Sequence, residues 1–336
     1  MIAAARRWMK AGAARLLNTA LPPTRHAPVV IGYHRVVEDF DQAAETSIPS
    51  MLVSAARLEE HLDWIGRRYR FVNLEELGSM IEAGERPERP VAAVTFDDGY
   101  RDFYEIALPL LRRKGIPAAV FAISGHVGTT KVQACDRIYL LLKRRVARGL
   151  SDQDPYEGMR RCITTMSLME LEEHIASLVA EDSIADELYR PFYSLTWDQL
   201  AAAHREGVTV GSHTRSHAVM TLESRPRLLS EARESRYELE HFLNSEIRHF
   251  AYPNGSFDAP AVDAVAASGY RFAYTTCSHR YPEHPLLTIP RTLLWQNSSL
   301  DAHRAFSGAV LNCQIQGAFG FAAACPPHGQ QLERWA

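Results

Sequence analysis

Cysteine is scarce in this chain, and no two cysteines have the CxxC spacing. The 336 residues contain five cysteines, at positions 135, 162, 277, 313 and 325. Their odd number and wide separation argue against a disulfide framework and against a structural zinc site. We expect reduced thiols, most of them buried.

An excess of positive charge is also lacking. The chain has 37 Lys and Arg against 40 Asp and Glu, a formal net charge of -3, which gives no support for nucleic-acid binding. Neither a P-loop nor a GxGxxG pattern occurs, which disfavours a nucleotide enzyme. The fractions of apolar residues, 46%, and charged residues, 23%, are those of a globular protein with a sizeable core.

A long uninterrupted apolar run is missing too. Lys10 and Arg15 interrupt the apolar stretch that a secretory signal would need in residues 1–20, and polar residues interrupt the apolar patches of 305–325. Residues 1–20 are typical of a basic amphipathic helix, which either contacts an anionic membrane surface or is a solvated helix or frayed tail. We expect a cytoplasmic protein, with peripheral contact to the inner membrane as the alternative, rather than a secreted one.

Strand-like and helix-like segments alternate through most of the chain. Continuous apolar runs of the kind that parallel sheets bury are followed by stretches with helical spacing. About seven such units predict a barrel-like α/β fold. The expected strands include 28–34, 91–96, 116–123, 249–252, 270–276 and 286–295, and the expected helices include 54–69, 102–114, 197–207, 223–244 and 259–268.

Residues 127–190 interrupt this alternation. They contain two charge-rich helical stretches and no clear strand, so we predict an inserted helical subdomain or lid that the barrel does not need. The chain then divides into an N-terminal basic helix (1–25), a main domain (26–310) that carries the insertion, and a C-terminal tail (311–336).

Two adjacent carboxylates, Asp97 and Asp98, come directly after the apolar run 91–96. Like charges at close range raise the pKa of one group unless a cation separates them, so the pair favours a bound divalent metal. Neighbours along an extended chain point in opposite directions, so the two aspartates can have different roles. Taken alone, the pair is also compatible with a helix N-cap at a βα turn.

Two histidines four residues apart, His213 and His217, follow another strand-like run. If the loop turns helically, both rings share a face. Two imidazoles and a carboxylate form a facial three-ligand set that leaves metal positions open for water and substrate. These residues and His34 all follow predicted strands, at the carboxyl ends where barrel folds carry active sites.

The stretches TFDDGY (95–100) and SHTRSH (212–217) resemble the first two motifs of carbohydrate esterase family 4, the NodB-homology polysaccharide deacetylases. The resemblance covers roughly residues 28–125 and 192–295. It implies a distorted (β/α)7 barrel, here with a helical insertion, and hydrolysis of acetyl groups on glycans.

The same resemblance implies a role for each motif residue. Asp97 would be the general base, while Asp98, His213 and His217 would hold one divalent metal. Zinc is the first expectation, and cobalt, nickel and iron also suit such a ligand set. A metal polarises the acetyl carbonyl and lowers the pKa of water, which a nearby carboxylate can then deprotonate.

A third motif of the family corresponds to FAYPNG (250–255), where Tyr252, Pro253 and Asn254 are the candidates for substrate and oxyanion contacts. Asn254 stands where the family usually has an aromatic residue. Its backbone N–H could still face the oxyanion, because that role needs no particular side chain. A plain Pro-Asn-Gly turn explains the same residues equally well.

The family's final Leu-x-x-His motif is not recognisable, and GYHRV (32–36) instead precedes the aspartates. This order resembles the circularly permuted branch, which includes poly-N-acetylglucosamine deacetylases. It implies that His34 is the catalytic acid, with a structural histidine as the alternative. Arg291 could pair with Asp97 in place of the missing motif arginine, or form an ordinary salt bridge.

These observations predict a metal-dependent hydrolase that removes N-acetyl groups from an amino-sugar polysaccharide or glycolipid. The expected partner is therefore an N-acetylated glycan. A metal-dependent amidase on a non-sugar amide and a catalytically silent glycan-binding module remain alternatives. We interpret the residues without motif support as structural, namely Asp258, His126, His174 and His303.

Overall fold

The computed structural model describes residues 28–182 and 184–318. The helix predicted at residues 1–25 lies outside the described residues, and with it the predicted membrane contact. No helix in the described part of the chain is long and apolar enough to cross a membrane. Four of the cysteines are described and all are buried, namely Cys135, Cys162, Cys277 and Cys313.

Seven parallel strands form a barrel whose two sheet edges are joined by one short run of chain. At one edge β10 pairs with β9, and at the other β11 pairs with β1. β10 and β11 are separated by Arg291 alone, so together they act as the seventh strand and close the sheet. The predicted (β/α)7 barrel is confirmed. The strands in sheet order are β1 (Val29–Tyr33), β5 (Val91–Phe96), β6 (Ala118–Ala122), β7 (Thr209–Ser212), β8 (His249–Ala251), β9 (Phe272–Thr275), β10 (Ile289–Pro290) and β11 (Thr292–Leu293).

The barrel is distorted because its strands are short and unevenly paired. β1 and β5 share five register pairs, whereas β7 and β8 share one, between Ser212 and Phe250. A short strand β4 (Arg70–Phe71) adds to the start of β5, and β2 (Arg35–Val37) pairs with β3 (Leu52–Ser54) outside the barrel.

Alternation along the strands divides their side chains between two apolar layers. Val30 and Phe121 belong to the cluster inside the barrel. Their neighbours Ile31 and Val120 belong to the layer between the strands and the surrounding helices. This period of two determines which residues at the strand ends reach the barrel mouth.

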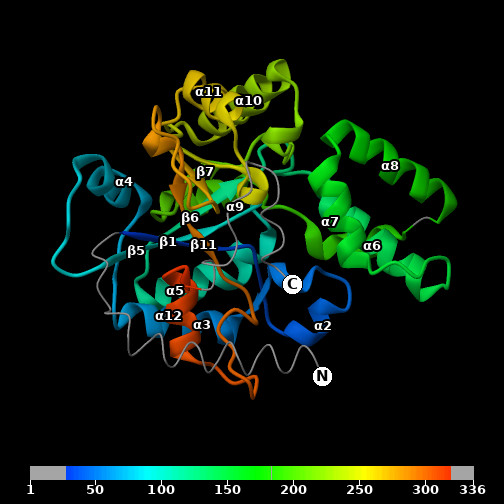
Figure 1. Ribbon diagram of the computed structural model, residues 1–336, viewed down its shortest axis with the longest axis horizontal. Helices are drawn as coiled ribbons and strands as arrows, with labels where there is room; N and C mark the ends of the chain where they lie inside the picture. Colours follow the sequence, from blue (N-terminus) through cyan, green and yellow to red (C-terminus); the bar gives the residue numbers. More distant parts are fainter. Residues whose placement is uncertain (1–27, 183, 319–336) are drawn as a thin grey trace.

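Two of the helix ends that local sequence signals predict are confirmed, whereas the helix predicted at 102–114 is a π-helix over Phe103–Ala107 followed by α5. Ser54 accepts a hydrogen bond from the N–H of Arg57 and so caps α3, and Gly115 ends α5 in the left-handed conformation. Figure 1 shows α10 and α11 together on one side of the barrel and α3 and α12 on the opposite side. These helices are α2 (Phe40–Ala44), α3 (Ala55–Gly66), α4 (Leu74–Ala83), α5 (Leu108–Lys114), α9 (Trp197–Arg205), α10 (Arg225–Leu243), α11 (Ala259–Ala267) and α12 (Gly308–Ile315).

The last described helix, α12, crosses the predicted boundary between the main domain and the tail at residue 311. Leu311 and Ile315 belong to the same buried layer as the helices around the barrel. The chain up to Ile315 therefore contributes to the main core.

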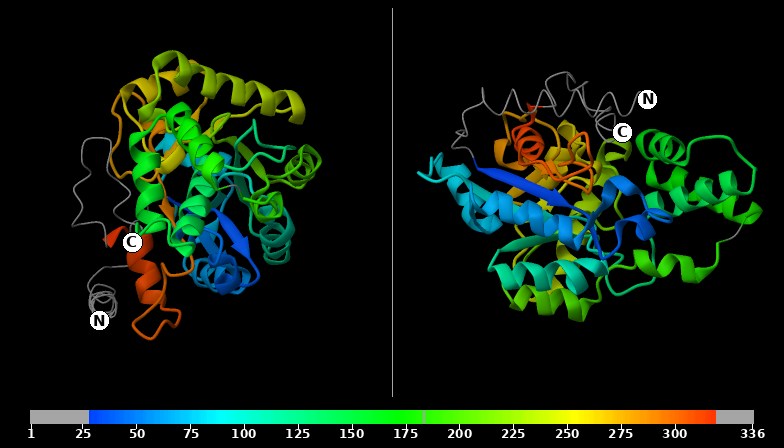
Figure 2. Two further views of the ribbon diagram at one scale, coloured as in Figure 1. Left: turned by 90° about the vertical axis from the view of Figure 1, so that its right-hand side faces the viewer. Right: turned by 90° about the horizontal axis from the view of Figure 1, so that it is seen from below.

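The segment 127–190 forms a helical lobe beside the barrel mouth (Figures 1 and 2). Its described residues contain no β-strand, but three α-helices where the sequence predicts two helical stretches. The extra boundary arises at Ser167, whose capping box with Glu170 starts a new helix directly after the previous one. The helices are α6 (Ala134–Ala147), α7 (Pro155–Thr165) and α8 (Leu168–Glu181).

This lobe has a hydrophobic cluster of its own, which includes Ile138, Leu141 and Ile175. The cluster extends to Ile48 and Tyr100, which belong to loops at the mouth of the barrel. The insertion is therefore packed on the barrel, and its dispensability stays a prediction.

Candidate active site

The predicted site residues reach one end of the barrel because of the strand alternation. His34 follows β1, Asp97 follows β5 and His213 follows β7, while Arg291 lies between β10 and β11. His34, Asp97 and Arg291 each lie an even number of residues from a residue of the inner cluster. His213 lies an odd number of residues from Val210 of the outer layer. All four side chains therefore point into the barrel mouth. All four line a single pocket, together with Asp98 and His217.

Asp98 reaches the same pocket through an unusual backbone conformation. Regular alternation would turn Asp98 outward, because its neighbour Asp97 points inward. Instead Asp98 adopts a left-handed φ of 70°, which reverses the chain and brings the second carboxylate back over the mouth. Thr214 and His217 have φ values of 64° and 60°, so the loop from His213 to His217, called the histidine loop, also contains left-handed residues. Such conformations are costly for residues other than glycine and concentrate at functional sites.

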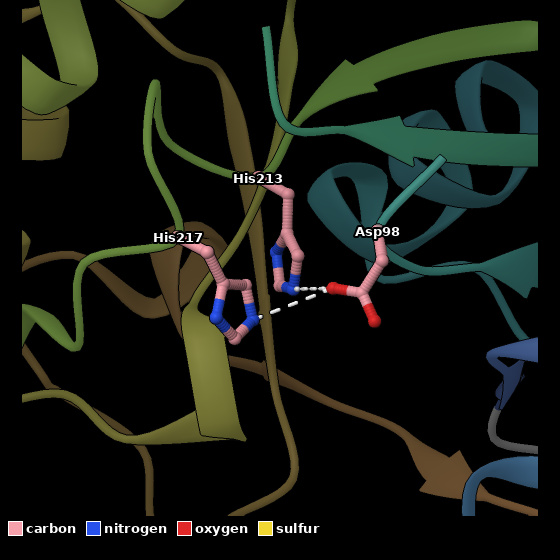
Figure 3. Close-up of side chains that lie close together, drawn as sticks. All are labelled: Asp98, His213 and His217. Carbon is pink, nitrogen blue, oxygen red and sulfur yellow. Dashed lines mark ion pairs between the residues drawn. The ribbon is translucent and has the colours of Figure 1, made fainter. Parts of the chain in front are cut away.

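Asp98, His213 and His217 form a cluster that could hold one metal ion. Their ligand atoms all lie within 4.8 Å of one another. Each histidine Nε2 is 3.4 Å from the same Oδ1 of Asp98, and Figure 3 shows both rings pointing at that oxygen. Both carboxylate oxygens of Asp98 are buried and lack a hydrogen-bond partner among the described residues. Buried carboxylates without partners are rare, so this donor set fits a bound cation.

Both histidines are held in the neutral form that binds metals. Burial lowers the pKa of His213 to about 4 and that of His217 to about 3. His213 Nδ1 lies 2.8 Å from the carbonyl oxygen of Ala251, so Nδ1–H donates there and the Nε2 lone pair faces Asp98. Burial also raises the pKa of Asp98. Its ionised form therefore lacks a stabilising positive charge, which a bound cation would supply.

Asp97 is held in a different electrostatic state. Two guanidinium nitrogens of Arg291 donate to its two carboxylate oxygens, each at 2.6 Å. Burial alone would raise the pKa of Asp97, but the charge and hydrogen bonds of Arg291 together with the nearby His213 and His34 outweigh it and lower the pKa below the ordinary value. His34 Nε2 lies 3.9 Å from Asp97 Oδ2 at the pocket surface. The arrangement therefore places an ionised carboxylate beside a histidine that reaches solvent.

The third predicted motif divides between the pocket and the core. Asn254 and Gly255 line the pocket, and Asn254 has a left-handed φ of 56°. Tyr252 is fully buried in the layer outside the strands, where its hydroxyl donates to the carbonyl of Leu287 at 3.1 Å. Its N–H is used in the sheet, where it donates to Tyr274. Neither Tyr252 nor the neighbouring Pro253 lines the pocket. Tyr252 is turned outward by the alternation along β8.

One supporting residue, Glu231 of α10, was missed by the sequence reasoning. Its side chain is 2% exposed and accepts hydrogen bonds from the N–H groups of Arg215 at 3.0 Å and Ser216 at 2.9 Å. It also accepts from the Ser216 hydroxyl at 2.6 Å. Glu231 therefore fixes the loop between His213 and His217. No local signal in the sequence marks it, because it is one of many charges on a long helix.

A buried polar network beside His34 was missed as well. Arg35 donates to Asp102 at 2.8 Å and to the carbonyl of Pro191, which directly follows the insertion. Asp102 also accepts from the N–H of Val36 at 3.2 Å. Tyr100 donates to Asp136 of α6 at 2.6 Å. The chain on the C-terminal side of His34 is thereby tied both to the barrel and to the lobe.

The insertion also supplies part of the pocket wall. Cys135 of α6 and a row of residues on α7, called the stripe, line the same pocket as the three candidate metal ligands, which are called the metal cluster. The stripe consists of Tyr156, Met159 and Ile163, whose spacing of three and four residues places them on one helix face. Such spacing is visible in the sequence but is indistinguishable there from ordinary core packing. Asp258, His126, His174 and His303 are not among the residues that line this pocket.

Comparisons with known proteins agree with this geometry. A family model for polysaccharide deacetylases matches residues 84–273. The Bacillus subtilis protein YxkH is 19% identical over 228 residues, which are 68% of this chain and 60% of YxkH. A poly-β-1,6-N-acetyl-D-glucosamine N-deacetylase of Staphylococcus epidermidis is 23% identical over 227 residues, 60% of this chain and 77% of that protein. The solved Streptococcus pyogenes deacetylase PplD, in complex with acetate, has a TM-score of 0.57 at 19% identity and covers 85% of this chain and 97% of its own.

We expect the His213→Ala, His217→Ala double variant to lose a divalent ion that the wild-type chain binds at one per molecule, because two of three ligands are removed. Elemental analysis after dialysis measures this directly. The His174→Ala, His303→Ala double variant is the matched control, since both of these histidines lie outside the pocket. Full retention of the ion by the first variant would refute the ligand set.

We expect Glu231→Ala to weaken metal binding about 10–100-fold, the usual effect of removing a group that orients ligands. Calorimetric titration of the metal-free protein with zinc gives the affinity without any assay of activity. Glu234→Ala, on the same helix, removes a half-exposed carboxylate that contacts the Arg215 side chain rather than the loop backbone, and should bind zinc like the wild type. A folded Glu231→Ala protein with wild-type affinity would show that the loop does not depend on this carboxylate.

Proposed function

Because the chain belongs to the polysaccharide deacetylase family, we propose that it removes N-acetyl groups from an amino-sugar glycan. The family resemblance of the aspartate and histidine motifs is thus confirmed. The observation that carries the proposal is the difference between two adjacent carboxylates. Asp97 is neutralised by Arg291, whereas Asp98 is buried without a partner beside two neutral histidines. One carboxylate is thereby available for proton transfer and the other for a cation.

The ligand set proposed for the ion is Asp98, His213 and His217. A divalent ion held there would polarise the acetyl carbonyl and lower the pKa of a water molecule. One carboxylate and two imidazoles suit zinc best, and cobalt, nickel or iron are compatible with the same donors.

The remaining residues of the pocket would move protons and stabilise charge. Asp97 accepts a proton from the attacking water as the water oxygen bonds to the acetyl carbon. His34 donates a proton to the nitrogen as the carbon–nitrogen bond breaks, so acetate and a free amine are released. The backbone N–H of Asn254 is the candidate donor to the oxyanion. Arg291 keeps Asp97 ionised and oriented throughout.

We propose an N-acetylglucosamine glycan, polymeric or lipid-linked, as the substrate. This is supported by the name of the Staphylococcus epidermidis relative, which deacetylates poly-β-1,6-N-acetyl-D-glucosamine. It is also supported by the position of His34 before the aspartate motif along the chain. This order resembles the circularly permuted branch of the family, which includes poly-N-acetylglucosamine deacetylases.

Acetate release across a panel of acetylated compounds tests the proposal. We expect the metal-loaded protein to release acetate from N-acetylglucosamine oligomers and glycosides, but not from non-sugar amides of similar size. Release from the non-sugar amides alone would favour the amidase alternative. Glycan binding without any release would favour a silent binding module.

We expect Asp97→Asn and His34→Ala each to lower kcat about 10²–10⁴-fold while the metal is retained, the usual scale for a general base or acid. If the two groups serve one hydrolytic step, the double variant should lose much less than the product of the two single losses. His303→Ala is the control for loss of a histidine outside the pocket. A His34→Ala enzyme with near-native activity on an N-acetylated sugar would defeat the acid assignment.

A further inference from the structure

The pocket wall that faces the metal cluster is largely aliphatic. Met159 and Ile163 of α7 contribute to it from the insertion, and Ile48 and Met51 contribute from the loop between β2 and β3. Leu293, just past Arg291, completes it from the closing strand. These residues come from three separate parts of the chain, so the apolar character is not the by-product of one helix face.

The apolar surface continues beyond the metal cluster into a second, smaller pocket. Ile163 and Cys135 line both pockets, as do His217 and Asn254. Aliphatic side chains from the insertion and the histidine loop form one part of the wall of the second pocket, beside polar groups such as Ser216. The aliphatic residues include Met166, Leu168, Leu171 and Val219. His217 and Asn254 therefore lie where the two pockets meet.

Few polar groups are available there for sugar hydroxyls. Apart from the residues assigned to catalysis and Gly255, the described polar side chains of the first pocket are those of Ser50, Tyr156 and Cys135. A hydroxyl that is buried against Met and Ile loses its water partners without replacement, which is unfavourable. A methylene group in the same place gains affinity, by about fourfold for each one buried.

We infer that this wall binds an aliphatic group covalently attached to the N-acylated sugar. The inference rests on the proposed function, because the group must be carried by the molecule whose amide is cleaved. Two sources share this chemistry: an alkyl or lipid aglycone, and an N-acyl chain longer than acetyl. The proposal thus favours a lipid-linked or long-acyl substrate over the interior of a free polysaccharide.

Matched substrates distinguish these sources. The full-length, metal-loaded protein is assayed with methyl and octyl β-glycosides of N-acetylglucosamine below the micelle concentration. It is also assayed with the methyl glycoside carrying N-acetyl or N-butanoyl, and with a β-1,6-linked tetramer of N-acetylglucosamine. The experiment has two arms: octyl against methyl glycoside, and N-butanoyl against N-acetyl. We expect kcat/KM to rise about tenfold or more with chain length in one of these arms, because apolar pockets discriminate methylene groups. Either arm supports the inference and identifies the source.

Variants locate the effect on the wall. Met51→Gln and Ile163→Asn should abolish most of the preference for the longer chain. Met169→Gln should preserve it, because Met169 is 69% exposed on α8 and is absent from both pockets. The inference is overturned by equal rates in both arms, by a preference that survives both pocket variants, or by a tetramer that is the best substrate.

A binding measurement separates failure of this inference from failure of the proposed function. If no compound releases an acyl group, the proposed function fails. Calorimetric binding of the octyl and methyl glycosides then tests the wall alone. Tighter binding of the octyl compound, lost in Ile163→Asn, would support the apolar subsite, and equal binding would overturn it.

Discussion

The bidentate ion pair between Arg291 and Asp97 is the interaction on which the architecture of the site depends. Arg291 lies in the single-residue gap between the two strands that close the barrel, and its side chain is almost fully buried. A buried guanidinium requires a paired anion, and Asp97 at the end of β5 supplies it across the barrel mouth. Because Asp97 is committed to Arg291, it does not compete with Asp98 for a cation. The residue that joins the two closing strands thus also separates the roles of the two carboxylates.

Two features of the backbone then assemble the rest of the site. The period of two along parallel strands brings His34, Asp97 and His213 to one mouth, since all three lie inward in register. Left-handed residues break that period where a second ligand is needed, at Asp98 and at His217. Glu231 holds the histidine loop in this shape from outside the barrel. The strained conformation of the histidine loop is therefore supported by a buried carboxylate that itself touches no ligand atom.

The insertion contributes to the site although no motif lies in it. Its helices pack on a hydrophobic cluster that includes Ile48 and Tyr100 of the barrel, and the Arg35 network joins the two parts through polar contacts. The same helices present Tyr156, Met159 and Ile163 to the metal cluster. In this scheme the residues that act on the amide bond come from the barrel mouth. The residues that contact the rest of the substrate come from the insertion and the nearby loops.

Local patterns in the sequence determined the elements, the barrel and the motif residues. Apolar runs, caps and the spacing of Asp97, Asp98, His213 and His217 are short-range properties, so they are legible without a structure. Tyr252 lies outside the pocket because one residue of register separates the pocket from the core. Glu231 and the apolar wall of the insertion could not be read, because they act through contacts between segments far apart in the sequence. Only the tertiary structure decided those contacts, since side chains on a helix or strand become functional when packing selects the face they present.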